Sequence, residues 1–387
     1  MRNSGLSVGL VAMLLAGLLG SCTHDDAGPP SDPRDVIELR WLKAYAHESR
    51  SDVETGLLWG LSLLGAKLPK GAQVIRWQGE RMVVDLARAQ VLEGTTPAWR
   101  ELIAAMKGSG EYQTHGALDV GRFLALTLGS PNHYYALTGA TASYSTARGH
   151  YRFDRKSAAV VRSAVAHGSR LIDLSIAESA EQLAFVAFEG KGSLADGTFD
   201  AHEMELLDMM PNGQLRFALY DLGGHLEPGA SPELTAAGKP AKCMWCHESG
   251  LQPTFVDYAG ARGYYDRREF EALLRERREL LHAYRDGVDT QIEYRNRQDH
   301  TYAELLYLTF EEPSRERLAR EWGVSPERAA ELLRGKPTHA QAEFAYLGSE
   351  LYRREDVEAL APYGVLAGPQ SIREASVSEP HIVEVRP

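Results

Sequence analysis

The chain has little positive charge. Its 387 residues include 42 lysines and arginines against 53 aspartates and glutamates, which gives a formal net charge of -11 at pH 7. A surface that binds nucleic acid needs the opposite sign, so nucleic acid is excluded as the main partner. The composition, 44% hydrophobic and 25% charged, is that of a globular protein with one large domain or two to three smaller ones. No internal repeat, low-complexity tract or glycine-rich phosphate loop is present.

The apolar run near the N-terminus is too short to cross a membrane as a helix. It reads GLSVGLVAMLLAGLLG, follows Arg2 and covers 16 residues, whereas a spanning helix needs about 20. A run of this length fits the core of a secretory signal. It ends in Leu19-Gly20-Ser21-Cys22, which resembles the lipobox of bacterial lipoproteins, where a cysteine becomes lipid-modified and N-terminal after cleavage. The alternative is an ordinary signal peptide cut nearby, with Cys22 incidental.

The lipobox resemblance implies an exported, membrane-anchored protein. Residues 1–21 are then the signal peptide, and Cys22 carries the lipid. Thr23 at the next position, rather than aspartate, implies retention at the outer membrane of a Gram-negative bacterium, with the protein facing the periplasm. Residues 22–34 hold three prolines, three aspartates and one glycine, a composition typical of a flexible tether. The folded body is expected to start near Asp35.

Cysteine is scarce, with three in the whole chain, and the two beyond Cys22 fall in the pentapeptide CMWCH. Residues three and four apart lie on one side of a helical turn, so Cys243, Cys246 and His247 are expected to face one partner. The pentapeptide resembles the haem attachment motif of c-type cytochromes. That resemblance covers these five residues only. It implies one haem c, attached covalently through Cys243 and Cys246, with His247 as an axial ligand of the iron.

Two other readings of the cysteine pair stay open. A structural zinc site takes four ligands, and without a second CxxC it would have to borrow distant histidines. A thiol-disulfide redox pair is the stronger alternative, because exported CxxC pairs often exchange disulfides. That motif usually follows a strand, whereas the approach here is the Gly/Pro-containing TAAGKPAK. A plain disulfide across so short a loop would constrain little chain entropy.

Methionine is absent from the 140 residues that follow His247. Many small cytochromes c take their second axial ligand from a downstream methionine, so this sequence departs from that pattern. The candidates for a second ligand are His225, His282, His202 and Met204. His225 lies in a glycine-rich loop and His282 near the end of an amphipathic helix. An open sixth position is the other possibility, and it would allow the iron to bind a small molecule.

The expected fold is α+β and differs from the small all-helical cytochrome c fold. Residues 35–156 are expected to form a mixed α/β region, 157–240 an antiparallel β-rich region, and 241–387 a helical region around the haem. Helical spacing of apolar residues predicts helices in 35–49 and 96–110, and a short helix near 157–168. A hairpin is predicted over 73–86, and strands near 170–176, 183–190, 199–209 and 214–222, the last two joined by an Asn-Gly turn.

After the motif the sequence predicts helices over 266–284, 301–310, 314–323 and 325–335. Thr301 and Glu304 stand in capping-box register at the start of the second. The last two resemble a DNA-binding helix-turn-helix in pattern, but an acidic, exported protein favours a plain helical hairpin.

The sequence thus predicts a periplasmic, lipid-anchored, monohaem c-type protein that transfers single electrons to a partner protein. The alternative is a haem enzyme or ligand-binding protein with an open distal site, acting on peroxide, a gas or a nitrogen oxide. A thiol-disulfide protein without haem is the third possibility.

Overall fold

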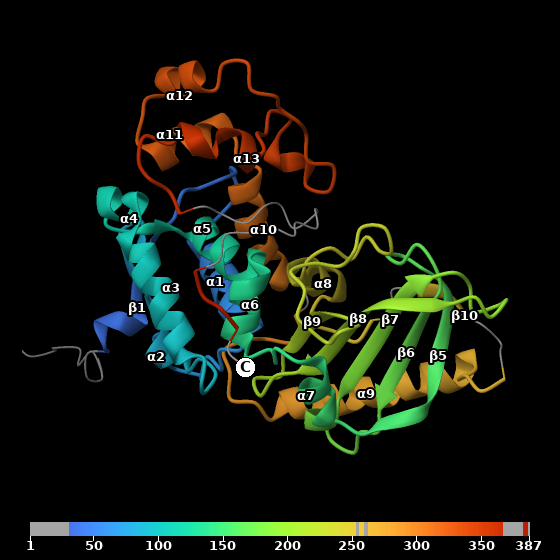
Figure 1. The fold of residues 1–387 in the computed structure, drawn as a ribbon. Helices are drawn as coiled ribbons and strands as arrows, with labels where there is room; N and C mark the ends of the chain where they lie inside the picture. Colours follow the sequence, from blue (N-terminus) through green and yellow to red (C-terminus); the bar gives the residue numbers. More distant parts are fainter. Residues whose placement is uncertain (1–30, 253–254, 259–261, 297, 367–381, 386–387) are drawn as a thin grey trace, which may run out of the picture. The chain divides into compact units, whose positions relative to one another are not determined.

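The computed structural model describes residues 31–252, 255–258, 262–296, 298–366 and 382–385. The expected signal peptide over 1–21, the expected lipidation site Cys22 and most of the expected tether lie outside these residues. Helices and two sheets confirm the α+β class (Figure 1). The first element of the described residues is the short 3-10 helix Pro33–Asp35. Its Asp35 binds Arg100 with a 2.6 Å contact from Nε to Oδ1, which ties the start of the folded body to a helix.

The N-terminal region combines a small sheet with helices. Its sheet has the order β2-β3-β1-β4, antiparallel except for the pairing of β1 with β4. The strands are β1 Val36–Arg40, β2 Ile75–Gln78, β3 Arg81–Asp85 and β4 Leu118–Asp119. The helices are α1 Arg50–Leu63, α2 Leu86–Ala89, α3 Thr96–Gly108, α4 Gly110–His115, α5 Val120–Leu124, the π-helix Ala125–Gly129, α6 Pro131–Thr138 and α7 Tyr144–Gly149.

Two sequence predictions for this region are confirmed and one is wrong. The hairpin over 73–86 is β2 and β3, and the helix over 96–110 is α3. The helix predicted from Asp35 is instead the strand β1 followed by a loop. Ile37 and Leu39 are fully buried while their neighbours are partly exposed, which is the two-residue period of a strand. Pairing with β3 therefore outweighed the helical spacing of the apolar residues.

The larger sheet follows, with six antiparallel strands in the order β10-β5-β6-β7-β8-β9. The strands are β5 Phe153–Ser163, β6 Arg170–Ser175, β7 Ala184–Lys191, β8 Asp200–Met209, β9 Leu215–Asp221 and β10 Phe255–Tyr258. Four of these match the predicted strands. The turn between β8 and β9 contains Asn212 and Gly213, and the glycine adopts a left-handed φ of +87°, as an Asn-Gly turn requires.

The short helix predicted near 157–168 is wrong, because β5 occupies its first half. Ala158 pairs with Ile172 and Val160 with Arg170 in the antiparallel ladder of β5 and β6. Ala158 and Val160 are both fully buried beneath Phe270 and its neighbours. Small and β-branched residues suit a strand covered by a helix, so tertiary packing decided the conformation here.

The chain after β9 is mainly helical, as predicted. Its helices are α8 Pro240–His247, α9 Arg267–Asp286, α10 His300–Glu311, α11 Arg315–Trp322, α12 Pro326–Leu332 and α13 Arg354–Val357. The capping box predicted at Thr301 is not formed, since α10 starts one residue earlier with Asp299 as N-cap. In Figure 1, α9 runs along the larger sheet, and its Phe270 and Leu274 pack against Ile172 and Leu174 of β6.

Charged side chains are buried where α11 and α13 contact the N-terminal region. Glu321 of α11 has no exposed surface and accepts two hydrogen bonds from Arg354, at 2.8 and 2.9 Å. It also accepts one from Arg317 at 2.8 Å and lies 3.4 Å from Arg122 of α5. The α11–α12 pair, which resembles a helix-turn-helix in sequence, thus buries charged residues of its first helix.

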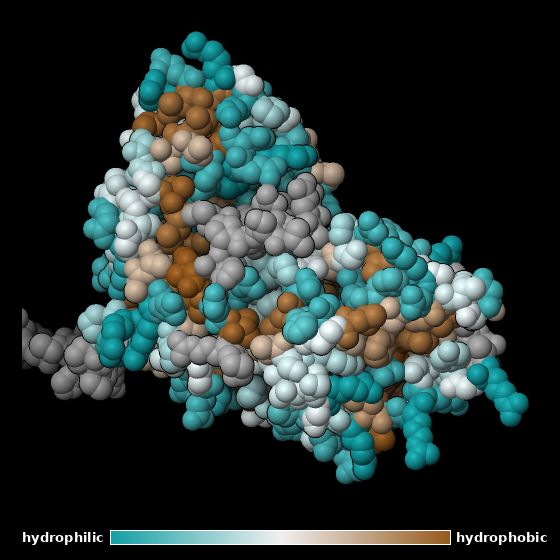
Figure 2. All heavy atoms as spheres, in the orientation of Figure 1, coloured by the Kyte–Doolittle hydropathy of each residue, from teal (hydrophilic) through white to brown (hydrophobic). Residues whose placement is uncertain are grey.

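Polar side chains cover most of the face seen in Figure 2, with apolar groups gathered between them. Among the residues described, the large apolar side chains that are clearly exposed are Ile176, Leu222 and Tyr346. Within the same residues no helix has the length and apolar character required to span a membrane.

Candidate functional site

Helix α8 carries the CMWCH motif and has two differing sides. Pro240 occupies its first turn, where the missing amide hydrogen costs nothing. Met244 and Trp245 are buried in the main core, and the Trp245 ring lies 6.4 Å from that of Tyr307. Cys243 and His247 lie on the other side of the helix. The packing of the two central motif residues therefore sets the direction in which the thiols and the imidazole point.

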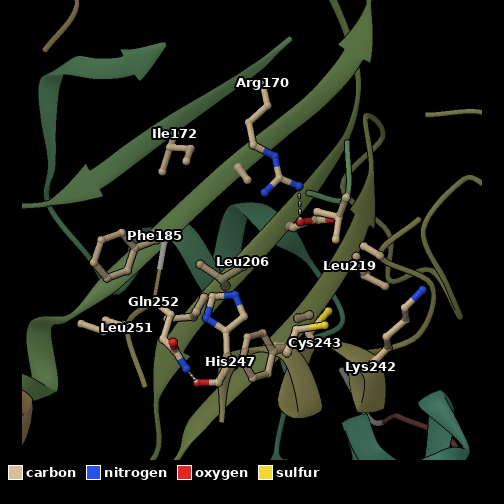
Figure 3. A pocket seen from close by; sticks show the side chains of 18 of the residues that line it. Arg170, Ile172, Phe185, Leu206, Leu219, Lys242, Cys243, His247, Leu251 and Gln252 are labelled. Atoms are coloured by element: carbon tan, nitrogen blue, oxygen red, sulfur yellow. Dashed lines mark hydrogen bonds and ion pairs between the residues drawn. The ribbon is translucent and has the colours of Figure 1, made fainter. Parts of the chain in front are cut away.

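The side chains of Cys243, Cys246 and His247 line one hollow, as their spacing predicts. The hollow lies between α8 and one face of the larger sheet (Figure 3), and Phe270 and Leu274 of α9 also line it. The space in and in front of it is about 950 Å³, a figure that includes open solvent at its mouth, so the enclosed part is considerably smaller. Apolar side chains from strands and α9 form much of the lining: Ile172, Phe185, Ala187, Leu207, Phe217, Leu219, Phe270 and Leu274.

One face of the larger sheet forms the floor of the hollow, and the register of its strands explains the shape of that floor. Ile172, Ala187, Glu205 and Leu219 stand opposite one another on four adjacent strands, so their side chains share one face. Neighbouring strands are about 4.8 Å apart, and the row therefore spans roughly 14 Å. Ala187 leaves room in the middle of this row, where a larger side chain would fill the hollow. The result is a broad, mostly apolar surface suited to a flat ring system.

The imidazole of His247 is held by one hydrogen bond. Its Nδ1 lies 3.2 Å from the carbonyl oxygen of Gly250, which can only accept, so Nδ1 carries the hydrogen. Its ring lies 5.3 Å from that of Phe217. Burial lowers the pKa of His247 below its ordinary value, which favours the neutral ring. Nε2 thus keeps its lone pair, and a metal-bound histidine commonly has this arrangement.

The turn after His247 is fixed by several contacts. Glu248 and Ser249 both have left-handed φ values, 46° and 56°, which are uncommon for residues other than glycine. Arg285 of α9 donates to the carbonyl oxygen of Ser249 at 2.6 Å, and Gln252 donates to that of His247 at 3.0 Å. These bonds hold the strained backbone that presents Gly250 to the imidazole, and strain of this kind clusters at functional sites.

The two thiols are free, with Cys243 partly buried and Cys246 exposed. Burial raises the pKa of the Cys243 thiol far above its usual value and also raises that of Cys246. Thiols that exchange disulfides usually have a lowered pKa, often at a helix N-terminus. Cys243 is instead the fourth residue of α8, and Cys246 lies near the end of the helix. This environment disfavours thiol-disulfide chemistry.

The candidates for a second axial ligand lie away from the hollow. Met204 is buried on β8, but it alternates with Glu205 and so points to the opposite face of the sheet. His225 is exposed and bonds Asp221 through Nδ1 at 3.1 Å. His202 is exposed as well and lies 3.4 Å from an Asp200 oxygen. His282 is on the exposed side of α9. His247 is the one histidine among the described lining residues, and methionine is not represented there.

Sequence reasoning missed the charged residues that line the hollow. Arg170 of β6 and Glu205 of β8 both face it, and their side chains are joined by a 3.2 Å ion pair. Arg170 gave a signal, because it shares its face of the predicted strand with Ile172 and Leu174, where a charge is unusual, but Glu205 alternates with the apolar Met204 and Leu206 and gave none. Their proximity depends on the register of β6, β7 and β8, which a single sequence does not reveal.

The residues present fit a covalently attached haem. The hollow combines two free thiols, an imidazole with an available Nε2 and a broad apolar floor. No group of three or more acidic, histidine or cysteine side chains in the described ranges is arranged to hold a bare metal ion. In comparisons with known proteins, no family model, curated protein or solved structure matches this chain.

Proposed function

We propose that this protein binds one haem c, attached to Cys243 and Cys246 and ligated by His247. The observation that carries the proposal is that all three side chains project from one helical turn into the same hollow. The bound haem would supply an iron that alternates between the ferric and ferrous states. His247 Nε2 would ligate the iron, and the bond from Nδ1 to Gly250 would keep the imidazole oriented.

The geometry favours an open side opposite His247. Among the described residues that line the hollow, no second histidine and no methionine is available as a ligand, and His225, His282, His202 and Met204 lie elsewhere. An iron with one protein ligand can bind a small molecule. The function that the site supports best is therefore binding or redox conversion of a small ligand, such as peroxide, a gas or a nitrogen oxide.

One-electron transfer is the second candidate function. Cys246 is exposed at the mouth of the hollow, so a haem attached there would have an edge close to the surface. An exposed edge allows electrons to pass to or from a redox partner protein. The two functions are compatible, since ligand conversion at a haem also needs an electron donor or acceptor.

We also propose that the protein works in the periplasm, anchored by a lipid on Cys22, in keeping with the lipobox-like LGSC. Export would deliver the chain to the compartment where covalent attachment keeps haem from escaping. The acidic net charge suits a protein that does not bind nucleic acid.

The test is to produce residues 23–387 with an export signal and a cytochrome maturation system, and then to denature the purified protein. Haem should stay with the denatured chain, whereas the Cys243→Ala/Cys246→Ala variant should lose it. Release of haem from the unaltered chain would overturn the proposal. The native ferrous protein should then bind carbon monoxide with a clear change in its absorbance spectrum. A spectrum that carbon monoxide leaves unchanged would instead indicate a second protein ligand and favour the electron carrier.

A further inference from the structure

Arg170 lies almost fully buried at the sheet side of the hollow, in a group of carboxylates. It is 6% exposed, and its Nη2 forms ion pairs with Glu189 and Glu205. Glu189 is 1% exposed and is absent from the described lining of the hollow, whereas Glu205 belongs to it. The arginine, labelled in Figure 3, thus connects Glu189, outside the described lining, with Glu205, which lines the same hollow as His247.

One carboxylate oxygen of Glu205 has no hydrogen-bond partner among the residues that the structure describes. Its Oε2 binds Arg170 at 3.2 Å, but its Oε1 is buried without a hydrogen bond in the described part of the chain. The side chain is 18% exposed, and the residue lines the hollow. Buried polar atoms are nearly always paired, and an oxygen that lines a cavity can pair with a ligand or an exchangeable proton.

Negatively charged side chains outnumber positively charged ones around Glu205. Glu203 on the same strand and Glu189 on β7 face it from the sheet, together with Arg170. Lys242 of α8 also lines the hollow, but its ammonium group donates to the carbonyl oxygen of Ala236. Glu189 and Glu205 thus share one arginine, and Glu203, whose Oε2 accepts a hydrogen bond from the Ser231 amide, adds a third carboxylate on the same face of the sheet. Burial raises the pKa of Glu205 and raises that of Glu203 to about 7.

Resting on the haem site proposed above, we propose that Glu205, positioned by Arg170, is the proton-exchanging group for a small uncharged ligand on the open side of the haem. The ligand class is a small neutral molecule with an ionisable hydrogen, such as hydrogen peroxide or hydrogen cyanide. When such a molecule binds, its hydrogen bond to Glu205 Oε1 becomes a proton transfer. The ligand's bond to hydrogen breaks, the O–H bond of the Glu205 carboxyl group forms, and no electron is exchanged.

The same charges argue against two other roles for Arg170. An arginine that anchors a haem propionate needs positive charge to spare, but the carboxylates around Arg170 leave the group negative. An anionic ligand would be repelled for the same reason. A neutral ligand that can release a proton has no such penalty, and a carboxylate with a raised pKa is a better proton acceptor than an ordinary one.

Cyanide and carbon monoxide separate this role from a structural one. At neutral pH cyanide is present as HCN, which gives up its proton when it binds haem iron, whereas carbon monoxide has no proton to lose. In the ferric haem-loaded protein, Glu205→Gln is expected to slow cyanide binding at least tenfold, measured by stopped-flow absorbance at pH 7. Its carbon monoxide affinity in the ferrous state should change less than twofold.

Glu189→Gln is the matched control, because Glu189 pairs with the same arginine but does not belong to the described lining. Its cyanide rate should change less than threefold. Glu205→Asp keeps a negative charge beside Arg170, and this variant replaces Glu205→Gln in the experiment if Glu205→Gln does not fold. Its shorter carboxylate should slow cyanide binding at least threefold.

The outcomes are distinct. Covalent haem that binds carbon monoxide, with cyanide rates equal in Glu205→Gln and the unaltered protein, would overturn the role of Glu205 alone. Equal slowing in Glu189→Gln and Glu205→Gln would also overturn it, because the effect would then come from the charge of the whole group. Absence of covalent haem, or of carbon monoxide binding, would reject the proposed open haem site itself and the role of Glu205 with it.

Discussion

Nδ1 of His247 lies 3.2 Å from the carbonyl oxygen of Gly250, three residues later in the chain. A carbonyl oxygen accepts only, so this contact determines which ring nitrogen carries the hydrogen. It leaves Nε2 as a lone-pair donor beside the two thiols of α8. The hydrogen bond exists because the backbone at Glu248 and Ser249 turns sharply enough to return Gly250 to the imidazole.

Replacing His247 by alanine is expected to leave haem attached and to change its coordination. The two thioether bonds do not involve the imidazole, so haem should still stay with the denatured chain. The ferric and ferrous absorbance spectra should change, because the iron loses its protein ligand. His225→Ala is the matched control, since His225 is exposed and bonded to Asp221, and its spectra should match those of the unaltered protein. Identical spectra for His247→Ala would show that His247 is not an axial ligand.

Replacing Cys22 by serine is expected to release the protein from the membrane, because a hydroxyl group in this place does not take the lipid. In fractionated cells the unaltered full-length chain should be found with membranes, and Cys22→Ser should lose that association. The Cys243→Ser/Cys246→Ser variant should stay with the membrane fraction while losing haem. Membrane association that survives Cys22→Ser would argue against the lipid anchor.

Replacing Glu321 by alanine is expected to lower the free energy of unfolding by about 3–5 kcal/mol, as for other broken buried ion pairs. The change leaves Arg317 and Arg354 buried without their shared carboxylate. Glu331→Ala is the matched control on α12, because Glu331 pairs with Arg328 at the surface and should cost less than about 1 kcal/mol. Denaturant unfolding followed by circular dichroism measures both. Equal losses for the two variants would contradict this account.

The free energy of unfolding is expected to fall as the pH rises from 5 to 8. Glu311 is 5% exposed, and burial raises its pKa to about 8. Between its ordinary pKa and this value the folded state holds a proton that the unfolded state has released, so raising the pH favours unfolding. One pKa unit corresponds to about 1.4 kcal/mol, and the loss from Glu311 is therefore on the order of 3 kcal/mol.

Glu311→Gln tests that dependence, since glutamine resembles the protonated carboxyl group and does not titrate. Denaturant unfolding at pH 5, 6, 7 and 8 should give a clearly flatter profile for the variant. Glu203, whose pKa is about 7, should account for part of the slope that remains. A variant profile as steep as that of the unaltered protein would show that Glu311 does not titrate in this range.

The sequence was a good guide to elements with a strong local signal. Alternation predicted β6 to β9, and helical spacing predicted α3 and α9. It failed at Val36–Arg40 and at Phe153–Ser163, which are strands although their apolar residues also fit a helix. In both places the deciding contacts come from a distant partner strand or a covering helix. Local spacing cannot report those contacts.

The sequence predicted the side of the candidate site that α8 forms. The CMWCH spacing placed Cys243, Cys246 and His247 on one side of a helix, and all three line the hollow. The second side was not predictable, because Arg170 and Glu205 lie on strands separated by β7. Their pairing follows from the register of three strands. The four residues considered as second ligands had no comparable spacing rule, and they lie away from the hollow.

The sequence by itself determined the α+β class and the set of side chains that α8 presents, because helical period and strand alternation are local properties of the chain. Only the tertiary structure decided what those side chains face. Packing of Met244 and Trp245 into the core turned the thiols and the imidazole toward the sheet. Strand register then placed Glu205, rather than a histidine or a methionine, in the row that forms the floor, since residues far apart in sequence meet only once the strands are paired.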